Sequence, residues 1–406
     1  MTQVPIRATA DALIPELRDL QRRLLVGGAG GAAVSLIGLF INPTQFLQSY
    51  LMAYMLCLGA TLGCLALGMM HQLSGGTWGV LLRRPIGAAT RVMPILTLLF
   101  LPIVFGMHRL YPWTNADLVA RDEILQHKRL YLNVPFFLVR AAIYFLVWNL
   151  LSYFLNSWSL QQDRTGDPRL ARRMQKVSAG GLVAYGLTIT FASFDWLMSL
   201  EPHWYSTIYG VLILGGQGLT AMAFLIVVVV WLSRWPPLDR IVIPGHLHDL
   251  GNLLLAFVML WAYFSFSQYL LIWAGNLPRE IAWYLHRLDT SWRFLGVALI
   301  VFHFAVPFVL LLSRSVKRQA GTIVRLAAFI LVVRLADLFW LIAPEFHESM
   351  SVSWLDIVLP LSLAAIWFGC FVWQLRGRAI LPVYDPQFDE TLGAIIARGA
   401  PRSTTH

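Results

Sequence analysis

Apolar runs of membrane-spanning length recur along this 406-residue chain. A helix needs roughly 20 mostly apolar residues to cross the ~30 Å hydrocarbon layer of a bilayer. Hydrophobic residues make up 58% of the chain and charged residues 13%, whereas a soluble domain has about a quarter charged residues. The chain is therefore too apolar to fold in water, and the runs predict an all-α integral membrane protein.

The runs predict ten transmembrane helices that form one body, residues 24–376. Residues 1–23 are expected to be a cytoplasmic N-terminal segment, either a surface amphipathic helix or a solvated tail, and residues 377–406 a cytoplasmic tail. In the short third run, Pro94 and Pro102 predict a bent or tilted helix. The ten predicted helices are Leu24–Ile41, Phe46–Met70, Met93–His108, Leu132–Asn156, Val177–Leu200, Ser206–Leu232, Leu247–Ala274, Trp292–Leu312, Ile323–Ala343 and Trp354–Gln374.

The basic residues indicate how these helices are oriented. Most of the 31 Lys and Arg residues fall near the termini and in alternate loops, on one side of the predicted bundle. Positive charge resists translocation, so this side and both termini are predicted to be cytoplasmic. The net charge of +10 then reflects topology, and no nucleic-acid partner is expected. The few basic residues in loops on the other side are Arg109, Arg121, Lys128, Arg129, Arg279 and Arg287.

Neither the cysteines nor the histidines form a cofactor motif. Cys57, Cys64 and Cys370 lie inside apolar runs and lack the spacing of zinc, iron–sulfur or c-haem sites. A transmembrane haem b needs two facing histidines, and only His303 lies deep in a predicted helix. We therefore expect the chain to hold no metal and no redox centre of its own.

Several ionisable side chains nevertheless lie inside the predicted helices, where an unpaired charge is costly. Arg140 and Asp195 lie at similar depth in two antiparallel helices, a placement that favours an ion pair. Arg334 and Asp337 are three positions apart and share one helix face, which predicts a second pair.

Two polar stretches accompany these charges. One begins the seventh helix and continues along a single stripe of it: His246, His248, Asp249, Asn252, Ala256, Tyr263 and Ser267. The other is the aromatic corner 191–210, FASFDWLMSLEPHWYSTIYG, which the topology places outside the cell. Its Trp196, Trp204 and Tyr205 are typical of interfacial anchors.

Two interpretations fit these residues. Carboxylates, imidazoles and hydroxyls can each accept and donate a proton, so the set suits a proton or quinol route. Alternatively, the ion pairs only hold helices together, and His303 is a hydrogen-bonded interior residue. The proton-transfer candidates are Asp195, Glu201, His203, His246, His248, Asp249, Asn252, Tyr263, His303 and Asp337, with Arg140 and Arg334 as charge partners.

Two long segments resemble a known family. The corner 191–210 and the segment Pro244–Glu280, PGHLHDLGNLLLAFVMLWAYFSFSQYLLIWAGNLPRE, are similar to the ActF subunits of bacterial alternative complex III, a quinol:acceptor oxidoreductase. The resemblance extends through all ten predicted helices. It implies an NrfD/PsrC-like fold of four-helix bundles in the bacterial inner membrane.

The resemblance also implies partners. An ActF subunit lies beside an ActC-like membrane subunit, an iron–sulfur subunit and c-type cytochrome subunits, which carry the iron–sulfur clusters and haem c. This chain would contribute a proton route, a contact with the quinone pool, or both, among membrane lipids. The alternatives are a purely structural scaffold of that complex and a stand-alone secondary transporter, a class that usually shows repeats and broken helices.

Overall fold

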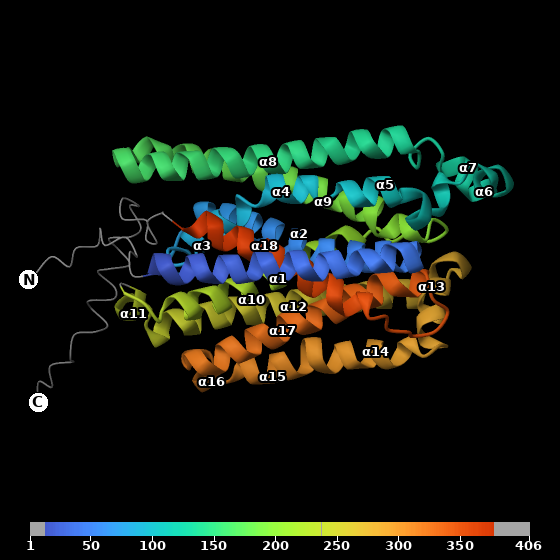
Figure 1. Cartoon of the computed structure of the whole chain (residues 1–406). Helices are drawn as coiled ribbons and strands as arrows, with labels where there is room; N and C mark the ends of the chain where they lie inside the picture. Colours follow the sequence, from blue (N-terminus) through green and yellow to red (C-terminus); the bar gives the residue numbers. More distant parts are fainter. Residues whose placement is uncertain (1–12, 237, 377–406) are drawn as a thin grey trace, which may run out of the picture.

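The computed structural model describes residues 13–236 and 238–376, and this part of the chain forms helices and no strand. Nine of its helices are long and apolar enough to cross a membrane. A bent pair, Arg83–Leu98 with Leu101–Leu110, makes a tenth crossing if it is one span. The long helices run side by side, and the start of α1 and the end of α18 lie at one end of the bundle (Figure 1). This architecture confirms the predicted all-α multi-pass membrane fold.

We call the end that holds the start of α1 and the end of α18 the terminal end, and the opposite end, with residues 191–210, the corner end. The first half of the chain forms α1 (Leu13–Ile41), α2 (Pro43–Ser74), η1 (Thr77–Gly79), α3 (Arg83–Thr90), α4 (Met93–Leu98), α5 (Leu101–Leu110), η2 (Pro112–Thr114), α6 (Ala116–Arg121), α7 (Glu123–Lys128), α8 (Val134–Thr165), α9 (Pro168–Trp196) and η3 (Met198–Leu200). The second half forms α10 (Tyr209–Leu232), α11 (Leu238–Ile241), α12 (Pro244–Gly275), α13 (Pro278–Leu288), α14 (Trp292–Leu299), η4 (Ile300–Ala305), α15 (Val306–Leu312), α16 (Arg314–Arg318), α17 (Ala320–Ile342), η5 (Ala343–Glu345) and α18 (Leu355–Leu375).

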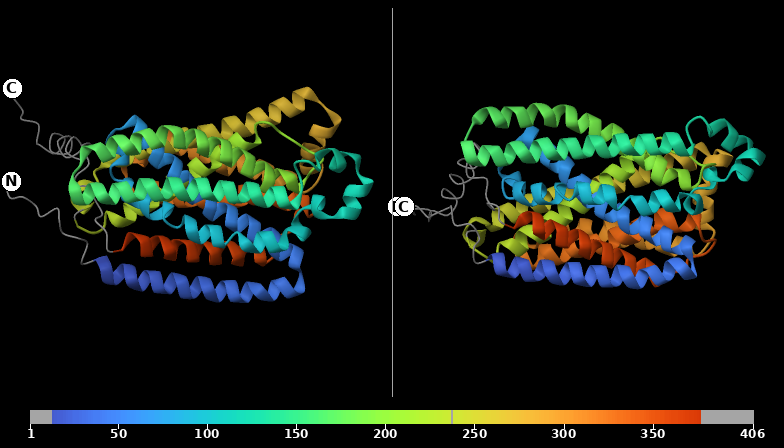
Figure 2. Two further views of the ribbon diagram at one scale, coloured as in Figure 1. Left: turned by 90° about the horizontal axis from the view of Figure 1, so that it is seen from above. Right: turned by 45° about the horizontal axis from the view of Figure 1, so that its top comes forward.

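Helices α2 and α10 form the centre of the bundle and pack against each other along their length. Helix α2 also contacts α5 and α9, and α8 covers α9, whereas α10 contacts α12 and α17, with α14, η4 and α15 beyond them. Helix α18 packs on α2, and α1 packs on the outside of α18, as the second views show (Figure 2). Polar groups on α2 and α10 must therefore find partners inside the protein.

Helix α1 begins earlier than the apolar run alone predicts. Residues 13–23, expected to be a separate N-terminal segment, form the first turns of α1. They contain three Leu and three Arg, which are good helix formers, so the helix extends beyond its apolar part. Residues 1–12 and the predicted tail 377–406 lie outside the described residues.

The third crossing is bent, as its prolines predict. The axes of its two halves differ by 54°. Pro94 and Pro102 occupy the first turns of α4 and α5, where a missing backbone N–H costs no helical hydrogen bond. The crossing also starts ten residues before the predicted Met93, at Arg83, so α3 brings two arginines into the terminal end of the bundle.

Candidate functional site

A buried ion pair lies where α10, α12, η4 and α17 meet. Arg334 Nη1 binds Asp337 Oδ2 on the same face of α17, which confirms the predicted pair. Trp261 of α12 donates its indole N–H to the same Asp337 oxygen, at 3.1 Å. Arg334 and Asp337 are 2% and 3% exposed, so this charge pair is buried in the interior of the bundle.

His303 lies beside this pair and lacks a partner of its own. Its side chain is fully buried, and neither ring nitrogen makes a hydrogen bond. Nδ1 is 3.9 Å from Asp337 Oδ2, and the imidazole centroid is 4.2 Å from that of Trp261. An N–H···O hydrogen bond needs about 2.9 Å, so a shift of about 1 Å would connect the imidazole to the carboxylate. A buried imidazole within reach of a carboxylate can take part in proton transfer.

The backbone around His303 departs from the α-helix. Residues Ile300–Ala305 form a π-helix between α14 and α15. Such wide turns are rare, and they often mark functional positions in helices. Pro307, in the first turn of α15, cannot donate a backbone hydrogen bond to the preceding turn, which favours this local rearrangement.

Gly216 of α10 makes room for the arginine of this cluster. A Cβ atom built on Gly216 would lie 2.3 Å from Arg334 Nη2 and 2.4 Å from Cζ. Only a residue without a side chain therefore allows the guanidinium to lie against α10. We call His303, Arg334, Asp337, Trp261 and Gly216 the His303 cluster.

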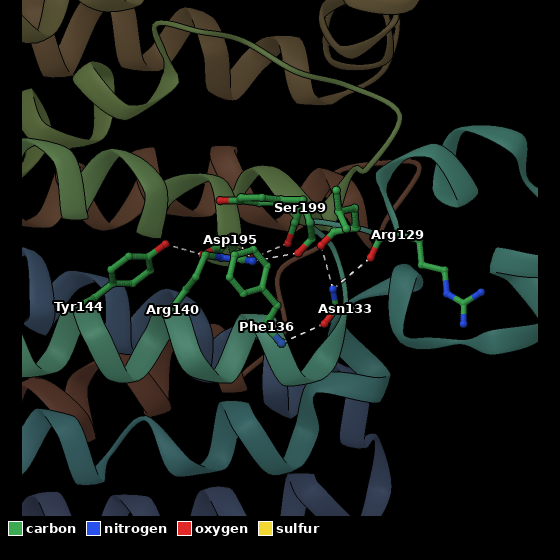
Figure 3. A network of polar contacts seen from close by, with 9 residues as sticks. Arg129, Asn133, Phe136, Arg140, Tyr144, Asp195 and Ser199 are labelled. Carbon is green, nitrogen blue, oxygen red and sulfur yellow. Dashed lines mark hydrogen bonds and ion pairs between the residues drawn. The ribbon is translucent and has the colours of Figure 1, made fainter.

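The predicted pair Arg140–Asp195 is confirmed and has a complete set of partners. Arg140 donates to both carboxylate oxygens of Asp195, at 2.9 and 2.8 Å, and to the Tyr131 carbonyl. Tyr144 donates its hydroxyl to Asp195 Oδ2 at 2.8 Å (Figure 3). The guanidinium also lies 3.8 Å from the centre of the Tyr131 ring. Because Asp195 is fully buried and fully bonded, this geometry favours a structural role.

A third buried pair was not predicted from the sequence. Arg287 of α13 donates to Glu345 Oε1 at 2.7 Å, and Trp283 donates to the same oxygen at 3.0 Å. Burial lowers the pKa of Arg287, while the charge of Glu345 opposes this shift. Both residues flank predicted helices, where charged residues are usually solvated, so only the folded contact identifies them as a pair.

Glu201 and His203 of the outer corner lie at its surface, whereas Trp196 and Trp204, which were expected to be interfacial anchors, are buried. His203 Nδ1 is 3.2 Å from Glu201, and Nε2 is 2.5 Å from Asp122, the N-cap of α7. The hydrogen bond from His203 lowers the pKa of Asp122, and the backbone N–H groups of Leu125 and Ile124 add to the effect. Glu201 and His203 therefore lie outside the buried network of Asp195.

The polar stripe predicted along α12 does not line the interior. Asn252 and Tyr263 are exposed on the surface of the bundle, and Tyr263 is 64% exposed. Asn252 accepts a hydrogen bond from Lys317 there. A single apolar helix leaves the direction of its polar face undetermined, and the face with Trp261 is the one that packs inward.

His246, His248 and Asp249 occupy the first turns of α12 at the terminal end. His246 is buried, and the other two are half-buried. Asp249 and Trp261 are twelve residues apart, which corresponds to about 18 Å along a helix at 1.5 Å per residue. These three residues therefore do not contact the His303 cluster, although they belong to the same helix as Trp261.

The His303 cluster brings an imidazole and a carboxylate close together, and both are groups that can accept and donate a proton. Across residues 13–236 and 238–376, no group of three or more His, Cys, Asp or Glu side chains is placed to hold a metal ion. In comparisons with known proteins, no model of a protein family and no curated protein matches the chain.

Proposed function

We propose that the chain is an ActF-like subunit of a bacterial quinol:acceptor oxidoreductase of the alternative complex III type. In this proposal it lies in the inner membrane with its terminal end in the cytoplasm. Partner subunits supply the iron–sulfur clusters, the haem c and the electrons, and this chain contributes a proton-transfer element, the His303 cluster. The same proposal includes a contact between this chain and the quinone pool, either beside the proton-transfer element or in its place.

The proposal depends on one observation, the surroundings of the buried His303 imidazole. A histidine kept only for packing would be expected to bond through at least one ring nitrogen, because an unpaired buried polar group costs about 1–3 kcal/mol. Here neither ring nitrogen has a hydrogen-bond partner in the protein, a carboxylate lies 3.9 Å away, and the residue belongs to a π-helix. The segment Pro244–Glu280, one of the two that resemble ActF, supplies Trp261 to the cluster.

Two substitutions test the proposed proton transfer. His303→Gln keeps a polar side chain and removes the titrating ring, and Asp337→Asn removes the carboxylate charge. General acid–base groups contribute typically 10²–10⁴-fold to rate, so quinol oxidation coupled to proton release should fall at least about 10-fold in His303→Gln. The measurement is turnover and proton yield per electron in the intact complex. Subunit and haem content serve as the control for assembly.

Tyr263→Phe is the matched control. Tyr263 also lies in a membrane helix and carries a titratable group, but it faces out of the bundle, so its loss should leave turnover and proton yield unchanged. Normal turnover and proton yield in both His303→Gln and Asp337→Asn, in complexes of normal composition, would refute a proton role for the cluster.

The second candidate function is a scaffold within the same complex. The buried ion pairs Arg140–Asp195 and Arg287–Glu345 favour it for the corner end of the bundle. In this case Arg140→Ala should reduce assembly and activity in equal proportion, with no separate change in proton yield.

A further inference from the structure

Four basic side chains form a stripe along α9 at the terminal end of the bundle. They occupy positions i, i+3, i+4 and i+7, so they share one face of the helix. All four are exposed, whereas residues of the opposite face, such as Leu170 and Met174, are buried. We call these four residues the α9 basic stripe: Arg169, Arg172, Arg173 and Lys176.

No acidic side chain is paired with the α9 basic stripe. Within residues 13–236 and 238–376, none of its four side chains makes an ion pair or a hydrogen bond with another residue. The two acids that precede the stripe in the chain have other partners. Asp163 is paired with Arg84, and Asp167 accepts the backbone N–H of Arg169 as the N-cap of α9.

This arrangement is unfavourable for α9 by itself. Residues three or four apart on a helix are neighbours, and like charges at that spacing repel one another. Arg169 also lies in the first turn of α9, where the helix dipole disfavours a positive charge. A negatively charged surface against the stripe would offset both effects. The repelling pairs are Arg169 with Arg172, Arg169 with Arg173, Arg172 with Lys176, and Arg173 with Lys176.

The stripe begins at the level of the membrane interface. Helices α8 and α9 pack together as an antiparallel pair joined at Gly166 and Asp167, so equal distances from this turn correspond to equal depths. Trp158 lies eight residues before Gly166, and Lys176 lies nine residues after Asp167, which places both at about the same depth. Trp158 packs against the exposed Phe154, with ring centroids 5.4 Å apart. Tryptophan is enriched where the hydrocarbon layer meets the headgroups.

From this level the two directions along α9 differ in character. Outward, the stripe continues from Lys176 to Arg169 for about 10 Å at 1.5 Å per residue, enough to cross a headgroup layer of roughly 5–8 Å. Inward, the same face carries Val183 and Leu187, which are 65% and 58% exposed. Between them and Lys176, a Cβ added to Gly180 would meet nothing within 4 Å. A phospholipid has this same order of a charged head and apolar chains, whereas an acidic soluble protein would match only the charged part.

We infer that the α9 basic stripe binds anionic phospholipids of the leaflet at the terminal end. The guanidinium groups contact the headgroup phosphate, because arginine binds phosphate oxygens in a bidentate manner. Val183 and Leu187 contact the acyl chains of the same lipids. Clusters of basic residues beside a membrane helix bind anionic headgroups in this way. The inference does not depend on the His303 cluster or on the proposed enzyme complex.

The test measures which lipid lies next to the stripe in the full chain, with whatever partners purify with it. A fluorophore is attached to Ala179→Cys, an exposed position near Lys176, and the unsubstituted chain treated in the same way gives the background. The bilayer mixes phosphatidylglycerol with phosphatidylcholine, and one of the two carries a nitroxide quencher close to its headgroup. A basic residue beside an anionic surface contributes roughly fivefold to binding, so the stripe should give phosphatidylglycerol a preference of at least about tenfold.

Two triple variants with the same change in net charge make the outcome specific. The stripe variant should lower the preference for phosphatidylglycerol at least about fivefold. The control variant removes three exposed arginines at the terminal end on or next to α16, which lies on the opposite side of the bundle from α8 (Figure 1), and should keep the preference. The stripe variant is Arg169→Gln, Arg172→Gln, Arg173→Gln, and the control variant is Arg314→Gln, Arg318→Gln, Arg325→Gln.

Salt provides a readout that needs no substitution in the stripe. At about 1 M salt the Debye length is only about 3 Å, so the preference for phosphatidylglycerol should largely disappear. The inference is overturned if phosphatidylglycerol is not preferred with the stripe intact, if the preference persists at high salt, or if both triple variants lose it equally. It is also overturned if neither lipid quenches the fluorophore in the intact particle, because a protein partner would then cover the stripe.

Discussion

At two places near the corner end of the bundle, a buried carboxylate accepts hydrogen bonds from an arginine and from one further donor. Asp195 accepts from Arg140 and Tyr144, and Glu345 accepts from Arg287 and a tryptophan. Breaking such a pair leaves an uncompensated charge, a loss of about 3–5 kcal/mol. His303 is different, because its two nitrogens are buried without partners. At the scale of single residues, this contrast separates the carboxylates that stabilise the fold from the histidine that we propose transfers a proton.

The His303 cluster depends on the absence of a side chain at position 216. Gly216→Ala would place a methyl group within 2.4 Å of the Arg334 guanidinium and push it away from Asp337. We expect a loss of about 1–3 kcal/mol in the free energy of unfolding, typical of overpacking. Gly186→Ala, on α9 with nothing within 4 Å of its added Cβ, should be neutral or slightly stabilising. The free energy of unfolding of both variants can be measured by denaturation in detergent with tryptophan fluorescence as the signal. Equal stability of Gly216→Ala and Gly186→Ala would contradict the packing argument.

At the scale of helices, α1 is attached to α18 through small residues. Without a hydrophobic driving force between helices in lipid, close backbone packing at glycines holds them together. A Cβ on Gly28 would lie 2.9 Å from the backbone oxygen of Ser362 and 3.0 Å from the backbone nitrogen of Ile366. The neighbouring Gly27 has open space around it. Gly28 therefore lies on the face of α1 that packs on α18, and Gly27 lies outside that face.

This packing predicts different effects for two adjacent glycines. Gly28→Ala should force the helices apart and lower stability by about 1–3 kcal/mol, whereas Gly27→Ala should have no destabilising effect. Protease accessibility of the α1 region in detergent reports the separation. If both variants are equally resistant, α1 is held by something other than its glycine face.

The short helix α7 at the corner end predicts a pH dependence. Asp122 caps α7 and bonds to His203, and these contacts lower the pKa of its carboxyl. The pKa of the Asp122 carboxyl is lower in the folded state than its value of about 3.9 in the unfolded state. The resulting stabilisation is fully present at pH values above the unfolded pKa, and it is lost as the pH falls through the folded pKa. The protection of residues 116–131 against hydrogen exchange, relative to the intrinsic exchange rate at each pH, should therefore decrease in acid below about pH 4. Asp122→Asn keeps a good N-cap but cannot titrate, so this acid step should disappear.

Local sequence rules predicted the elements better than their mutual orientation. The Arg334–Asp337 pair follows from helical spacing alone, and the bend of the third crossing follows from Pro94 and Pro102. The π-helix at His303 was not predicted, because Pro307 indicates a local rearrangement of the helix but not its form. The prediction that the polar stripe of α12 lines the interior was wrong, because Asn252 and Tyr263 lie on a helix face that points away from the bundle.

At the scale of the whole molecule, the apolar runs determine the class of fold, and the contacts between helices determine the sites. Each pocket or cluster joins residues far apart in the chain: Gly216 meets Arg334, and Arg84 meets Asp163. Charge counting cannot reveal such pairs. It does predict the orientation of the molecule, because the basic residues gather at the terminal end.

That orientation is open to a direct test with single cysteines. Leu130→Cys lies at the corner end, where the native leucine is 89% exposed, and Arg172→Cys lies exposed at the terminal end. A membrane-impermeant maleimide should label Leu130→Cys in intact spheroplasts and Arg172→Cys only in inverted vesicles. The unsubstituted chain controls for background, since Cys57 and Cys64 are buried and Cys370 lies within a membrane helix. The opposite labelling pattern would place the terminal end outside the cell and would contradict the predicted topology.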